Sequence, residues 1–237
     1  MFYILYVSFT LTFTTSALFF IWLLPFKIKF AYLSLWNKTI VFLSRYLLGI
    51  RYRVQGIKNI PKEGPFVILS KHQSQWETFF LLLPFNPVSI ILKKELLSIP
   101  GFGWGLRMMK TIPIDRSNPK QAMKQIQSDG LCRLTKDKMP VLIFPEGTRI
   151  PFGKRGKYAR GGASLAIAAK VPVICVTHNA GYFWPADKFL KFPGTVDVII
   201  SEPISSSGKT ALELTNMAEE WIESNLPTPA PHPLDKH

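Results

Sequence analysis

A histidine and a glutamate five positions apart are the residues best suited to acid–base chemistry in this sequence. His72 and Glu77 lie where an apolar run gives way to the polar segment Ser70-Lys-His-Gln-Ser-Gln-Trp-Glu77. A neutral imidazole can remove a proton from a hydroxyl group if a carboxylate fixes its tautomer. On one continuous helix the two side chains would point about 140° apart, so the pairing requires His72 to precede the helix. A turn histidine followed by an exposed glutamate is the alternative interpretation.

A second polar segment, Phe144-Pro-Glu-Gly-Thr-Arg149, directly follows another apolar run. Gly147 permits close approach of the backbone, Thr148 carries a hydroxyl donor, and Arg149 presents a planar fork of donors that suits phosphate. The segment therefore predicts an anion site. A turn with a surface salt bridge between Glu146 and Arg149 is the alternative.

In a third segment, an apolar run is again followed by an acidic residue and an arginine. Residues 111–116 form a short apolar run that closes with Asp115 and Arg116. Alone, this acid–arginine pair indicates little, but it places another guanidinium at the end of a candidate strand.

The elements around these segments predict an α/β domain with a mixed, mostly parallel sheet flanked by helices, because short apolar runs alternate with longer helical patterns. Asn118 and Pro119 mark one helix start. The predicted strands lie at 66–69, 88–92, 111–114, 141–144, 173–176 and 196–200, and the predicted helices at 119–136, 161–170 and 209–225.

The N-terminal segment predicts attachment to a membrane. No side chain is charged from residue 1 to residue 26, a length that can cross the roughly 30 Å hydrocarbon core of a bilayer. The stretch 27–50 is apolar but interrupted by lysine and arginine, as in an interfacial helix. Either the first segment spans, with the remainder of the chain on the cytoplasmic side, or both segments form a hairpin in one leaflet. We thus expect N-terminal membrane helices at 1–50, one folded domain at 51–226 and a disordered proline-rich tail at 227–237.

The charge of the chain favours an anionic lipid surface as its partner. The formal net charge is +14, and all charged side chains follow residue 26. We exclude nucleic acid, because no nucleic-acid module is recognisable and the basic residues are dispersed among apolar runs. Cys132 and Cys175 are far apart in apolar surroundings, which argues against a disulfide framework.

Taken together, these segments resemble the glycerolipid acyltransferases, and most closely the 1-acylglycerol-3-phosphate (lysophosphatidate) acyltransferases. The resemblance covers roughly residues 54–176. It rests on four blocks in the family's order: His72 with Glu77, then 114–116, then Pro-Glu-Gly-Thr-Arg at 145–149, then Val-Pro-Val at 171–173. Two positions depart from the family pattern. The acid after the histidine is usually aspartate, and the last block commonly has proline where this chain has Cys175.

The resemblance implies direct acyl transfer from acyl-CoA or acyl carrier protein, with no cofactor and no metal, to the sn-2 hydroxyl of lysophosphatidate. It implies that His72 is the general base and that Glu77 orients it. The implied substrate-binding residues are Arg116, Glu146, Gly147, Thr148 and Arg149, with Lys93, Lys94 and Arg160 as weaker candidates that a basic, lipid-facing surface would equally explain.

Rival functions have less support. Ser70 and Ser74 flank His72, but the chain lacks the Gly-x-Ser-x-Gly elbow of lipid hydrolases. The segment Ser207-Gly-Lys-Thr210 mimics a P-loop, yet its required first glycine falls on Pro203. Acceptors such as glycerol 3-phosphate or another lysophospholipid remain open, as does a non-catalytic protein that binds anionic lipid.

Overall fold

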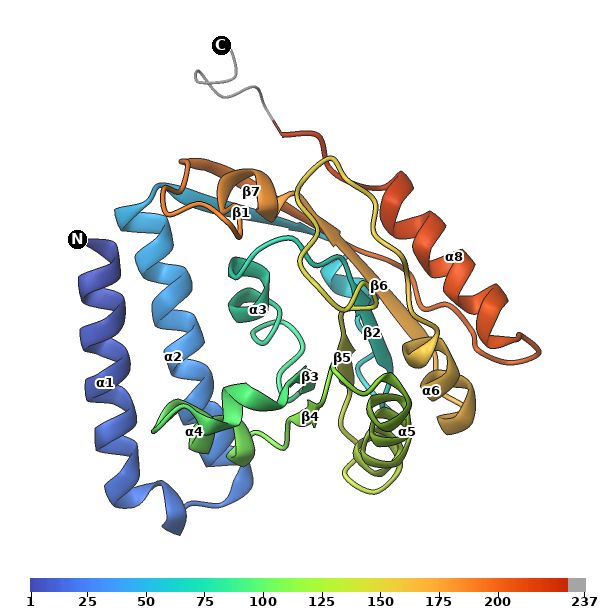
Figure 1. Cartoon of the computed structure of the whole chain (residues 1–237), viewed down its shortest axis with the longest axis horizontal. Helices are drawn as coiled ribbons and strands as arrows, with labels where there is room; N and C mark the ends of the chain where they lie inside the picture. Colours follow the sequence, from blue (N-terminus) through green and yellow to red (C-terminus); the bar gives the residue numbers. More distant parts are fainter. Residues whose placement is uncertain (230–237) are drawn as a thin grey trace.

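The structure, a computed structural model, describes residues 1–229 and contains a seven-stranded sheet with helices on both faces (Figure 1). The predicted tail at 227–237 therefore lies mostly outside the described residues. The strand order is β1-β7-β6-β2-β5-β3-β4, and among the described strands only the β6–β7 pair is antiparallel. The predicted α/β class is confirmed. The strands are β1 Ile50–Gln55, β2 Val67–Ser70, β3 Ser89–Lys93, β4 Ile112–Ile114, β5 Val141–Ile143, β6 Val173–His178 and β7 Gly194–Ile200.

The central strand β2 lies between β5 and β6, and every one of its residues is buried. A strand covered on both faces reads as a continuous apolar run, which is why the sequence predicts it well. The edge strand β1 was not predicted. It carries exposed Arg51 and Arg53, and Arg53 pairs with Asp197 of β7 at 2.7 Å, so its sequence does not read as a buried strand.

Three helices cover one face of the sheet, and all three were predicted within two residues. Asn118 caps the first by accepting the Gln121 N–H at 3.1 Å, and Thr210 and Glu213 form a capping box on the last. These helices are α5 Pro119–Thr135, α6 Gly161–Ala169 and α8 Ala211–Ser224.

The opposite face is covered by short helices between the strands and by the N-terminal hairpin, as Figure 1 shows. The hairpin consists of the two long helices α1 Phe2–Phe20 and α2 Phe26–Leu47. Thr10 accepts a hydrogen bond from the Trp36 indole at 3.0 Å, and Phe13 stacks on Tyr32, so the two long helices are tied together. The elements here are α1 Phe2–Phe20, α2 Phe26–Leu47, α3 Trp76–Phe80, α4 Phe102–Met108 and α7 Ala180–Phe183, with 3-10 turns η1 Ile21–Leu23, η2 Ile57–Asn59 and η3 Lys94–Ser98.

No helix within residues 1–229 is both long enough and apolar enough to cross a membrane. Helix α1, which occupies most of the expected spanning segment 1–26, packs against α2. Helix α1 ends at Phe20. Within it, the hydroxyl of Thr10 donates to the Tyr6 carbonyl and that of Thr14 donates to the Thr10 carbonyl.

The hairpin and the sheet share one hydrophobic core. Phe13, Phe30 and Trp36 of the hairpin belong to the same buried cluster as Ile68 of β2 and Ile174 of β6. A second apolar layer fills the space between the sheet and α5, α6 and α8. The position of the hairpin is thus fixed by packing against the sheet that carries the candidate site.

Candidate active site

His72 lies in the loop that follows β2, four residues before α3 begins at Trp76. Its Nδ1 atom is 2.9 Å from Oε1 of Glu77. The geometric requirement stated from the sequence, that His72 precede the helix, is met. The longer side chain of glutamate therefore still reaches the imidazole.

Glu77 is fully buried and is surrounded by donors. Its carboxylate accepts the backbone N–H groups of Gln73 at 2.9 Å and Ser74 at 2.8 Å, and the Ser74 hydroxyl at 2.6 Å. Burial raises the pKa of Glu77, but the hydrogen bond from His72, the nearby His178 and the Ser74 hydroxyl together lower it to about 2. The ionised carboxylate makes Nδ1 of His72 the protonated nitrogen and leaves Nε2 able to accept a proton.

A second buried histidine supports the loop from beneath. Nδ1 of His178 accepts the Ala180 N–H at 3.3 Å, so Nε2 carries the proton and donates to the Lys71 carbonyl at 2.9 Å. Burial lowers the pKa of His178, which keeps it neutral. His178 is not among the residues predicted from the sequence, although its place at the end of an apolar strand was a usable signal.

Glu146 turns back beneath the His72 loop. Its Oε2 accepts the backbone N–H of His72 at 2.7 Å, and its Oε1 accepts from Nζ of Lys71 at 2.7 Å. The Ile150 N–H also donates to the His72 carbonyl at 2.8 Å. The alternative prediction of a salt bridge between Glu146 and Arg149 is therefore wrong, because the Glu146 carboxylate pairs with Lys71.

A pocket of about 760 Å³ opens beside His72. Thr148 and Arg149 of the second segment and Arg116 of the third contribute to its wall. Burial lowers the pKa of Arg116, and so does the positive charge of Arg149, the other arginine of the pocket wall. Residues of three segments that are far apart in the sequence thus line one cavity.

The remaining predicted residues are more scattered. Lys93 lines the pocket, and its Nζ is 3.7 Å from Glu95. Lys94 pairs with Asp115 instead, and Arg160 stands at the N-terminus of α6, outside the pocket lining. Gly147 lies on the turn after β5 with a φ of 69°, a backbone conformation that favours glycine.

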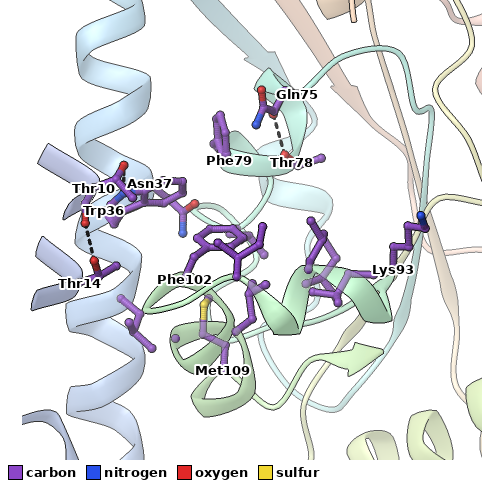
Figure 2. Close-up of a pocket in the computed structure, with 18 of the residues that line it drawn as sticks. Thr10, Thr14, Trp36, Asn37, Gln75, Thr78, Phe79, Lys93, Phe102 and Met109 are labelled. Carbon is purple, nitrogen blue, oxygen red and sulfur yellow. Dashed lines mark hydrogen bonds between the residues drawn. The ribbon is translucent and has the colours of Figure 1, made fainter. Parts of the chain in front are cut away.

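The rest of the pocket is lined mainly by apolar side chains and extends from His72 to the hairpin. Figure 2 shows Trp36 and Asn37 on one side of it and Lys93 on the other. Helices α1, α2 and α4 and strand β3 contribute to this lining, including Phe13, Thr14, Ala17, Leu33, Trp36, Phe102, Leu106, Met108, Ile90, Ile91 and Leu92.

The hydroxyl groups of Ser70 and Ser74, the two serines near His72, donate to acceptors other than the imidazole. The Ser74 hydroxyl donates to Glu77, and the Ser70 hydroxyl donates to the Lys71 carbonyl at 3.0 Å. Neither hydroxyl is hydrogen-bonded to the imidazole, so the geometry gives no support to a serine nucleophile.

A protein-family model described as Acyltransferase matches residues 51–179, more than half of the chain. A 1-acyl-sn-glycerol-3-phosphate acyltransferase of Pseudomonas aeruginosa is 45% identical over 230 residues, covering 95% of this chain and 89% of that protein. The chain belongs to the acyltransferase family. Its matched region contains all four sequence blocks.

More distant acyltransferases agree with this assignment. The 1-acyl-sn-glycerol-3-phosphate acyltransferase alpha of Mus musculus is 32% identical over 187 residues, which are 77% of this chain and 65% of the mouse protein. The crystal structure of a 1-acyl-sn-glycerophosphate (LPA) acyltransferase from Thermotoga maritima superimposes with a TM-score of 0.78 at 24% identity, covering 95% of this chain and 92% of that one. The similarity to the Thermotoga maritima structure shows that the two chains share a fold.

Proposed function

We propose that this acyltransferase transfers a fatty acyl group from acyl-CoA or acyl carrier protein to the sn-2 hydroxyl of lysophosphatidate, giving phosphatidate. The observation that carries the proposal is that His72, paired with Glu77, lines a mainly apolar pocket whose wall also includes Arg116 and Arg149. The names of the relatives support the same reaction.

In the proposed reaction His72 acts as the general base. Its Nε2 takes the proton of the acceptor hydroxyl while that oxygen attacks the carbonyl carbon of the thioester. The carbon–sulfur bond then breaks, and the departing thiolate takes the proton from the imidazolium. Glu77 is ionised throughout and stabilises the imidazolium that forms between the two proton transfers.

Arg116 and Arg149 bind the acceptor phosphate in this proposal, since paired guanidinium groups suit a dianion. Gly147 and Thr148 shape the turn that carries Arg149 into the pocket wall, and Glu146 holds the His72 loop rather than touching substrate. Lys93 lies on the same pocket and supplies further positive charge. Lys94, held by Asp115, and Arg160, outside the lining, receive no role in phosphate binding.

The apolar part of the pocket holds an acyl chain, because it is lined by aliphatic and aromatic side chains from α1, α2 and α4. Those helices belong to the segment 1–50 or pack against it. The hairpin therefore has two roles in the proposal, attachment to the membrane and formation of the acyl groove.

We further propose that the hairpin lies in one leaflet, with the domain at 51–226 against the cytoplasmic face, where anionic head groups attract its excess of lysine and arginine. Large apolar side chains are exposed along the hairpin, among them Ile4, Leu11, Phe19, Trp22, Leu23, Leu35 and Phe42. The loop at 185–193 adds Phe189 and Leu190, which are 74% and 69% exposed, and Tyr3 of α1 stacks on Phe189.

The test is acylation of lysophosphatidate by the purified protein in mixed micelles, with acyl-CoA and acyl carrier protein thioesters as alternative donors. We expect phosphatidate from the wild type and a loss of about 100-fold or more in kcat for His72→Ala and Glu77→Gln. Glycerol 3-phosphate and lysophosphatidylcholine compete as acceptors in the same assay. Preference for either would replace lysophosphatidate as the substrate, and no acylation of any acceptor would favour a non-catalytic lipid-binding protein.

A further inference from the structure

Lys71, the residue before His72, is a charged side chain with no exposed surface. Its Nζ atom donates to Oε1 of Glu146 at 2.7 Å and to Oε1 of Glu223 at 2.6 Å. Tyr158 donates its hydroxyl to the same oxygen of Glu223 at 2.9 Å. One ammonium group therefore joins two carboxylates in the interior of the protein.

Burial of an ion is costly unless it is paired and hydrogen-bonded, so a lysine in this position is held by its partners. The partners come from distant parts of the fold. Glu146 follows β5, whereas Glu223 lies in the last turn of α8, on the face of the sheet opposite the hairpin (Figure 1). The cluster connects α8 to the loop that carries His72.

The backbone of Lys71 is held independently of its side chain. Its N–H donates to the Val176 carbonyl at 3.0 Å, and its carbonyl accepts from His178. What the side chain adds is control of Glu146, whose other oxygen accepts the N–H of His72. A chain of contacts thus runs from Glu223 through Lys71 and Glu146 to the backbone of the candidate base.

We infer that Lys71 and Glu223 are positioning residues for acyl transfer: Glu223 holds the ammonium group of Lys71, and Lys71 holds Glu146 so that it fixes the backbone of His72. This inference rests on the proposed function. A small displacement of a base from its productive geometry can reduce a rate by about 100-fold. The contribution therefore falls on kcat, since neither side chain lines the substrate pocket.

The experiment compares Lys71→Met, which removes the charge but keeps an unbranched side chain, with Glu223→Gln and with the double variant. The matched control is Glu219→Gln, one turn earlier on α8, where the carboxylate pairs with exposed Arg155 at 2.9 Å. Each protein is assayed with lysophosphatidate below its own melting midpoint, so that every variant is folded during the assay.

We expect Lys71→Met to lower kcat by about 30-fold or more, with KM for donor and acceptor changed by less than about threefold. Glu223→Gln lowers kcat by about fivefold, and Glu219→Gln matches the wild type. Because Glu223 acts through Lys71, the double variant has the kcat of Lys71→Met alone.

Two results would overturn the inference: a Lys71→Met protein with kcat within twofold of the wild type, or losses in the double variant that multiply as for independent sites. A change confined to KM would also contradict it. Failure of the wild type and of Glu219→Gln to make phosphatidate would instead overturn the proposed function, so the two failures are distinguishable.

Discussion

The imidazole of His72 and the ring of Phe144 lie face to face, with centroids 4.1 Å apart and planes inclined by 19°. Phe144 is the first residue after β5 and also lines the pocket. The stack adds to the hydrogen bond from Nδ1 to Glu77 in restricting rotation of the imidazole.

Removing this ring is expected to slow the reaction. Because an aromatic pair contributes about 0.5–1.5 kcal/mol, Phe144→Ala should lower kcat by a factor of about 2 to 13. Phe144→Tyr keeps the stack and serves as the control. Equal kcat values for the alanine variant and the wild type would show that the stack has no part in orienting His72.

Acidification should destabilise the protein partly through Glu77. Its carboxyl has a pKa of about 2 in the folded chain and a reference value of 4.5. The folded state therefore gains stability from Glu77 that is complete above about pH 4.5 and is lost as the pH falls toward 2. Chemical unfolding in detergent, followed at several pH values, should give a smaller loss for Glu77→Gln than for the wild type over this interval. Parallel curves would contradict the assignment, since the other carboxyl groups titrate in both proteins.

The groove between the hairpin and the sheet should limit the length of the acyl chain. Ala17 of α1 is buried and lines this groove, so Ala17→Phe fills part of it. We expect mass spectrometry of the phosphatidate formed from mixed thioesters to show shorter acyl chains. Thr12→Phe, on an exposed position of the same helix, is the control. An unchanged product profile would place the acyl chain elsewhere.

Adjacent glycines at the start of α6 should respond differently to alanine. A Cβ atom on Gly162 would lie 2.5 Å from Cδ2 of Leu69, a residue of β2 that is itself buried. A Cβ atom on Gly161 would have ordinary contacts, with Met123 at 3.4 Å and Ile126 at 3.7 Å. Gly162→Ala should therefore lower the free energy of unfolding by about 1–3 kcal/mol. Gly161→Ala should change it by less than about 1 kcal/mol. Thermal unfolding of both variants measures the difference, and equal effects would contradict the packing argument.

The loop beside the hairpin should contribute to membrane binding. Replacing exposed Phe189 and Leu190 together by serine is expected to reduce co-sedimentation with vesicles of anionic phospholipid, because about 0.8 kcal/mol is lost for each buried methylene. Leu212 and Met217, exposed on α8 across the sheet, provide a control pair for the same replacement. If both double variants bind equally, the loop does not enter the lipid.

Local sequence signals explain which features could be predicted. His72 and Glu77 are close in sequence, so helix geometry alone predicted the condition for their contact, which is that His72 precede the helix. The partner of Lys71 could not be found in this way, because Glu223 lies 152 residues away in an ordinary amphipathic helix. Nothing in a pattern of nearby residues indicates such a pairing.

Two further features depended on tertiary structure. The edge strand β1 has too many exposed charges to resemble the buried strands, and only its pairing with β7 explains it. Burial raises the pKa of the Cys175 thiol to about 12. The proline that the family commonly has here would lack the N–H that Cys175 donates to Ser201 at 2.8 Å.

The pairing of β1 with β7 also has a consequence for the order of events during synthesis. Arg53 and Asp197, which pair across these two strands, are separated by 144 residues. While the ribosome has made only the first half of the chain, β1 has no partner, and the hairpin before it is already complete. The apolar helices therefore leave the ribosome before the sheet that will hold them exists, and early contact with lipid would protect them from aggregation.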